Sequence, residues 1–190
     1  MKGQKTLKLY TVCATAVFAA LISVGAFIKL PMPPVPITMQ MLFTFLAVLL
    51  LGKRAGTLSV CLYILIGLLG LPVFSFGGGF NSFLQPSFGY IIGFALGNFF
   101  SGLVIEKFRM KTLKAYFSAL VFNIFIVYVT GISYLCLIMT LYLDKELILS
   151  RILVDSFLVF IPGDLLKAFV ASLVAVRVKP LIDRFNTGGK

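Results

Sequence analysis

Long apolar segments that carry almost no charge recur along most of this 190-residue chain. A helix that crosses the hydrocarbon core of a bilayer needs about 20 predominantly apolar residues. Hydrophobic residues make up 60% of the sequence and charged residues only 12%, so a soluble domain of this length could not bury its apolar surface. The sequence therefore predicts an all-α integral membrane protein, with residues 1–190 forming a single membrane domain.

Six apolar segments predict six transmembrane helices, at roughly residues 9–28, 38–51, 55–71, 88–105, 115–143 and 152–176. The second segment is short, since about 14 residues at a rise of ~1.5 Å each span only ~21 Å. The uncharged segment before it, LPMPPVPI at residues 30–37, contains four prolines and cannot be helical. Non-helical backbone at membrane depth persists where protein covers it or where it lines a cavity. This loop and the short helix are therefore predicted to cover a site.

A second uncharged connection, PVFSFGGGFNSFLQPS at residues 72–87, is rich in glycine and phenylalanine. A connection of this length without predicted secondary structure is typical of a lid over a binding site. A solvated loop would carry charges, whereas this one can fold back over apolar surface. The alternative is a plain interfacial loop anchored by its aromatic side chains.

The distribution of basic residues predicts the orientation of the chain. Most of the 17 Lys and Arg residues precede the first segment, join segments two and three or four and five, or follow the sixth. Only Lys29, Lys145 and Arg151 lie on the other side. Because cytoplasmic loops carry the excess of Lys and Arg, both termini are predicted to be cytoplasmic and the two uncharged loops to lie outside.

A charged pair, Asp164 and Lys167, lies deep in the last apolar segment. Residues three apart share one face of a helix. Burying either charge in hydrocarbon costs on the order of 2.5 to 3.5 kcal/mol, and a partner, a cavity or a ligand usually offsets such a cost. Pro162 and Gly163 are expected to soften the helix just before the pair, which is placed near mid-depth. An ion pair that merely fixes helix packing is the alternative.

Other polar residues could converge on this pair if the outer loops descend to meet it. The candidates are Gln40, Asn81, Gln85 and Tyr90, with an apolar wall from Phe74, Phe76, Phe80 and Phe83. A mostly apolar pocket with a few placed polar groups suits a small organic ligand.

Several function classes are disfavoured by what the sequence lacks. There is no histidine, no phosphate-binding loop, no metal-ligand spacing and no pair of intramembrane carboxylates. We therefore expect no enzyme activity, no metal, no cofactor and no nucleic acid as partner. A chain without an ATP site would need a partner to drive active uptake. A stand-alone facilitator or secondary transporter for a small solute is the second hypothesis, although no internal repeat is visible.

Small residues recur at intervals of four in the fourth segment, at Gly89, Gly93, Gly97 and Ser101. Such a stripe lets another helix approach closely. Packing within the chain is the favoured interpretation, and contact with a partner protein is the alternative. The first segment carries a similar pair, Ala16 and Ala20.

Four motifs in order resemble the BioY family, the biotin-specific substrate-binding (S) components of energy-coupling factor transporters. They are PMPPVPITMQ at 31–40, GLLGLPVFSFGGG at 67–79, QPSFGYIIGF at 85–94 and IPGDLLKA at 161–168. The resemblance implies a six-helix S-component fold in the cell membrane that captures biotin from outside. It also implies a transmembrane coupling protein, which would meet Ala16 and Ala20, and two cytoplasmic ATPases.

The resemblance also gives roles to the polar candidates. Asp164 would accept hydrogen bonds from the ureido N–H groups of biotin, and Asn81 would pair with the same edge. Lys167 would neutralise Asp164 or bind either the ureido oxygen or the carboxylate. The predicted biotin-binding residues are Gln40, Gly79, Phe80, Asn81, Gln85, Tyr90, Asp164 and Lys167.

Overall fold

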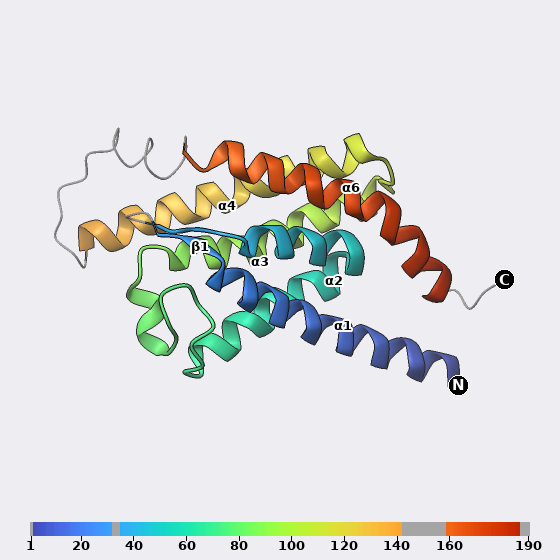
Figure 1. Cartoon of the computed structure of the whole chain (residues 1–190), viewed down its shortest axis with the longest axis horizontal. Coiled ribbons are helices and arrows are strands. Elements are labelled where there is room, and N and C mark those ends of the chain that lie inside the picture. Colours follow the sequence, from blue (N-terminus) through green and yellow to red (C-terminus); the bar gives the residue numbers. More distant parts are fainter. Residues whose placement is uncertain (1, 32–34, 142–158, 187–190) are drawn as a thin grey trace.

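The computed structural model describes residues 2–31, 35–141 and 159–186, and the helices in these ranges pack side by side (Figure 1). This part of the chain is all-α, as predicted, apart from two short strands. Its helices are α1 (Lys2–Phe27), α2 (Gln40–Leu68), α3 (Phe88–Lys107), α4 (Leu113–Leu141) and α6 (Ile161–Asn186). The strands are β1 (Lys29–Leu30) and β2 (Ile37–Thr38), and a short 3-10 helix, η1, covers Phe80–Leu84.

Four of these helices are long and apolar enough to cross a membrane: residues 9–27 of α1, and α2, α3 and α4. Many large apolar side chains remain exposed on their outer faces, among them Val17, Leu58, Phe125 and Val129. Exposed apolar side chains of this kind suit contact with lipid, where helices need not turn a polar face outward.

Helix α2 folds back on itself at Gly52. The backbone of Gly52 is non-helical, with φ of 83° and ψ of 179°, in the region that glycine adopts without a side-chain clash. A straight helix would hold Gln40 and Tyr63 roughly 34 Å apart, at ~1.5 Å per residue. Instead the two side chains are hydrogen-bonded at 2.5 Å. The predicted segments 38–51 and 55–71 are therefore two antiparallel arms, which we call the first arm and the second arm of α2.

Close packing between α3 and α4 depends on the small-residue stripe. A Cβ atom added to Gly93 would lie 2.9 Å from the Cα of Val127, and one added to Gly97 would lie 2.3 Å from Asn123 Oδ1. A Cβ on Gly89 would lie 2.2 Å from that of Tyr134. These distances leave no room for a larger side chain, so the predicted use of the stripe within the chain is confirmed.

A buried asparagine network joins the arms of α2 to α3 and α4. Asn98 Nδ2 donates to the carbonyls of Thr44 (3.1 Å) and Gly56 (3.3 Å), one on each arm. Asn123 Nδ2 donates to Asn98 Oδ1 (3.1 Å) and to Ser101 Oγ (3.0 Å). We call Asn98, Ser101 and Asn123 the asparagine network.

The last helix differs from its predicted bounds. Residues 142–158, which include Lys145, Arg151 and the predicted start of a helix at 152, lie outside the described residues. In the described part of the chain, α6 begins at Ile161 and continues past the predicted end at 176 to Asn186. In this added part of the helix, Lys179 Nζ donates to the Leu50 carbonyl (2.8 Å) and pairs with Asp183 (3.2 Å).

Candidate functional site

The predicted charged pair lies at the start of α6, not in the middle of a helix. Asp164 is in the first turn and is only 5% exposed. The expectation that Pro162 softens a helix before the pair is wrong, because Pro162 is in the first turn, where its missing N–H breaks no helical hydrogen bond. The positive end of the helix dipole stabilises a carboxylate at this place. Its own helix thus offsets part of the cost of burying Asp164.

Both oxygens of Asp164 have hydrogen-bond donors. Lys167 Nζ lies 2.9 Å from Oδ1, which confirms that the two charges share a helix face. From α4, the Tyr128 hydroxyl donates to Oδ2 at 2.6 Å. A carboxylate has about four lone-pair sites, so Asp164 keeps acceptor capacity for a further donor.

The hydrogen bonds continue from Lys167 to α2. Lys167 Nζ donates to the Thr38 carbonyl at 2.8 Å, and the Thr38 hydroxyl donates to Gln40 Oε1 at 3.0 Å. The Gln40 amide then donates to the Tyr63 hydroxyl on the second arm. We call this continuous set the Asp164 arc: Tyr63, Gln40, Thr38, Lys167, Asp164 and Tyr128. It joins β2, both arms of α2, α4 and α6.

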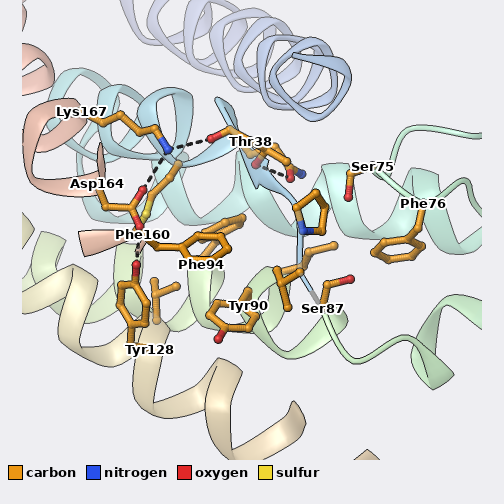
Figure 2. Close-up of a pocket in the computed structure, with 16 residues that line it drawn as sticks. Thr38, Ser75, Phe76, Ser87, Tyr90, Phe94, Tyr128, Phe160, Asp164 and Lys167 are labelled. Atoms are coloured by element: carbon orange, nitrogen blue, oxygen red, sulfur yellow. Dashed lines mark hydrogen bonds and ion pairs between the residues drawn. The ribbon is translucent and has the colours of Figure 1, made fainter. Parts of the chain in front are cut away.

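Most of the arc borders one pocket (Figure 2). The lining atoms surround about 550 Å³ of space, including the part open to solvent. Pockets for small ligands are lined mostly by apolar side chains with a few placed polar groups. Asp164, Lys167 and Tyr128 lie together at one end in the view, and Ser75, Phe76 and Ser87 lie toward the other, with Tyr90 between them. Apolar walls come from Val35, Pro36, Met41, Phe76, Ile91, Phe94, Val127 and Phe160.

The two loops that were predicted to cover a site both contribute to this pocket. Val35 and Pro36 come from the proline segment, and Ser75 and Phe76 come from the Gly/Phe loop. Phe74 anchors the second loop: it is 1% exposed and makes edge contacts with Tyr63 and Phe88. Between the loops, Lys29 Nζ donates to the Ser75 carbonyl.

The structure brings together four of the eight predicted site residues. Gln40, Tyr90, Asp164 and Lys167 all line the pocket. Gly79, Phe80, Asn81 and Gln85 are not part of its lining, and Phe80 is 77% exposed. Positive φ angles at Gly77 (117°) and Gly79 (98°) turn the chain, which then forms η1. The expectation that residues 72–87 lack secondary structure is wrong at η1.

Four polar residues of the lining were missed from the sequence: Thr38, Ser75, Ser87 and Tyr128. Thr38 and the two serines lie within segments that were predicted to cover the site, so their position carried a signal. Tyr128 lies within a long apolar segment, and nothing in the sequence around it indicates that its hydroxyl contacts Asp164. Only the packing of α4 on α6 reveals it.

A membrane-capable helical fold with a small, mostly apolar pocket at one end defines a multi-pass membrane protein built to hold a small solute. The chain belongs to the BioY family, whose model matches residues 1–184. The probable biotin transporter BioY of Lysinibacillus sphaericus is 42% identical over 94% of this chain and 89% of its own length. The biotin transporter BioY of Thermotoga maritima is 39% identical over 87% of this chain and 93% of its own length.

A solved structure agrees with the family assignment. The crystal structure of the S-component for biotin from an ECF-type ABC transporter superposes with a TM-score of 0.76 and 31% sequence identity. The match covers 91% of this chain and 92% of that one. The family is one of transporter components in the cell membrane and not one of enzymes.

Proposed function

We propose that this chain binds biotin in the pocket beside the Asp164 arc, as the S component of an ECF-type transporter. The observation that carries the proposal is the buried pair, Asp164 and Lys167, facing an apolar pocket in a chain of the BioY family. Biotin combines a polar ureido group with an apolar sulfur-containing ring and an acid tail. A pocket with one polar end and apolar walls matches this division.

The ureido group fits the free capacity of the charged pair. Asp164 accepts the ureido N–H groups through its remaining lone pairs. Lys167 has three N–H donors, of which two are used by Asp164 and the Thr38 carbonyl, so the third is available for the ureido oxygen. Phe76, Tyr90, Phe94 and Phe160 pack against the ring and the tail.

The arrangement in the membrane follows from the folded-back helix. If the two arms of α2 act as separate helices, the described residues contain six: α1, both arms, α3, α4 and α6. This number supports a single membrane domain. An even number of crossings places both termini on the same side. The excess of basic residues makes that side the cytoplasm and puts the pocket outside.

The partners are a transmembrane coupling protein and two cytoplasmic ATPases, with the lipid bilayer around them. Ala16 and Ala20 on α1 are exposed, whereas Ala19 on the adjacent row is buried against the bundle. A row of exposed alanines lets a partner helix approach closely. Biotin is the cargo, and the chain needs no cofactor of its own.

The ligand is tested by mass spectrometry of small molecules released from the purified chain, followed by titration of the emptied protein with biotin. We expect biotin to co-purify and to rebind at one site. A folded protein that neither carries nor rebinds biotin would contradict the proposal. Liposomes containing only this chain test the alternative, because gradient-driven uptake without ATPases would indicate a stand-alone transporter.

A further inference from the structure

The acid tail of the ligand needs a partner that the Asp164 end of the pocket does not offer. A carboxylate withdrawn from water requires charged or multiple hydrogen-bond donors. Lys167 is the one cation among the described residues that line the pocket, and its Nζ already contacts two acceptors. A second carboxylate placed there would also lie beside Asp164 and be repelled. The tail is therefore better accommodated at the opposite end of the pocket.

Lys29 is in β1 and is not itself part of the lining, but its side chain extends to a residue at that opposite end. Lys29 pairs with Thr38 in the antiparallel ladder of β1 and β2. Residues that pair directly across such a ladder have their side chains on the same face. Thr38 lines the pocket and contacts Lys167, so the strand pair itself lies beside the Lys167 side of the pocket. The Lys29 side chain reaches the Gly/Phe loop, where Nζ donates to the carbonyl of Ser75, another lining residue. Figure 2 places Ser75 far from Asp164, beside Phe76 and across from Ser87.

Lys29 forms no ion pair with any other described residue, and its side chain contacts a neutral carbonyl. An ammonium group has three donors, so this contact leaves two for an anion. Lys29 is also exposed, which lets its Nζ move between the carbonyl and a ligand without a buried rearrangement.

We propose that Lys29 binds the carboxylate of the ligand and so makes the pocket selective for the free acid over its neutral esters and amides. The proposal rests on the proposed function, because it takes the ureido ring to lie at Asp164.

The test compares biotin with biotin methyl ester, whose tail is neutral, by titration of the purified chain. Wild type is expected to bind biotin about tenfold more tightly than the ester, since a charge-assisted contact of this kind corresponds to roughly one decade in affinity. Lys29→Met is expected to lose about that factor for biotin and to bind the ester within about twofold of wild type. Lys29→Arg, which keeps the charge, is expected to retain the preference for the acid.

Lys114→Met is the matched control, because Lys114 is an exposed lysine near the start of α4, away from the pocket lining. It should change neither affinity. Ester binding by Lys29→Met also reports that the variant is folded. If Lys29→Met lowers the affinity for biotin and for the ester equally, or lowers neither, Lys29 does not bind the carboxylate and the proposal is overturned. Equal affinity of wild type for both ligands would overturn it alone, whereas no binding of either would overturn the proposed function as well.

Discussion

Two polar clusters are buried in this apolar bundle, and they are arranged in opposite ways. In the asparagine network, Asn98 is 0% exposed, and both of its amide hydrogens and its oxygen have partners within the protein. In the Asp164 arc, Asp164 and Lys167 are also buried or nearly so, but they border a pocket. Their lone pairs and N–H groups are only partly used.

The difference separates a structural polar cluster from a binding site. A closed network stabilises one packing of helices and has nothing left to offer a ligand. A cluster with unused capacity keeps a desolvation cost that a ligand can offset. Burial of polar residues in a membrane protein is therefore not by itself a sign of a site; spare capacity facing a cavity is.

The strongest test of the comparison is Asp164→Asn. The amide keeps the size and one acceptor for Lys167, but it loses the negative charge and half of the acceptor capacity. We expect biotin affinity to fall by more than about tenfold, which is over ~1.4 kcal/mol, while the protein still folds. Isothermal titration gives the affinity, and gel filtration in detergent checks the fold. Unchanged affinity would remove Asp164 from the set of ligand residues.

Tyr128→Phe sharpens the comparison within the arc. Its hydroxyl donates to Asp164 Oδ2 at 2.6 Å, and the change removes this donor while keeping the ring. Because Lys167 still holds the other oxygen, we expect biotin affinity to fall by about three- to tenfold, the size of one hydrogen bond. The same titration measures it. A loss as large as that of Asp164→Asn would indicate that Tyr128 contacts the ligand directly.

Asn123→Ala probes the closed network. It leaves Asn98 Oδ1 and Ser101 Oγ without the donor that now satisfies them. Side-chain hydrogen bonds between membrane helices contribute about 0.6–1.7 kcal/mol, so we expect a lower unfolding temperature. Thermal unfolding in detergent measures this, and biotin affinity of the folded protein should stay within about twofold. A selective loss of affinity with unchanged unfolding would reverse the roles given to the two clusters.

Among the changes within the Asp164 arc, Tyr63→Phe should have the smallest effect on biotin affinity. Tyr63 is fully buried and lies outside the pocket lining, but its hydroxyl accepts the Gln40 amide. Phenylalanine keeps the edge contact with Phe74. The freed Gln40 amide is then less well oriented, and we expect about a two- to threefold loss of biotin affinity. A Gln40→Leu variant already lacks this amide, so adding Tyr63→Phe to it should cost nothing further; an additive loss would place Tyr63 in another role.

Much of the fold could be predicted because its signals are local. The apolar segments marked the helices, and the i, i+3 spacing put Asp164 and Lys167 on one face. Residues 32–34 of the proline segment lie outside the described residues. The boundaries of α6 were predicted less well. Pro162 was interpreted as a kink inside a helix. It is in the first turn of α6, where a proline costs no helical hydrogen bond.

The site could be predicted only in part. Gln40 and Tyr90 were correctly grouped with the pair around one pocket, because both adjoin segments with unusual composition. The composition of the Gly/Phe loop correctly indicated that this loop borders the site. The individual residues chosen from it, Gly79, Phe80, Asn81 and Gln85, do not line the pocket. The turns at Gly77 and Gly79 precede η1, while Ser75 and Ser87 near the two ends of the loop face the pocket.

The sequence by itself determined the membrane class, the helical segments, the uncharged loops and the charged pair, since each depends on residues within a few turns of one another. Tertiary structure decided which polar groups meet. Tyr128 reaches Asp164 across 36 residues, and Lys167 reaches Thr38 across 129. Contacts over such separations depend on the fold-back at Gly52 and on the close approach of α3 to α4, which no local periodicity encodes.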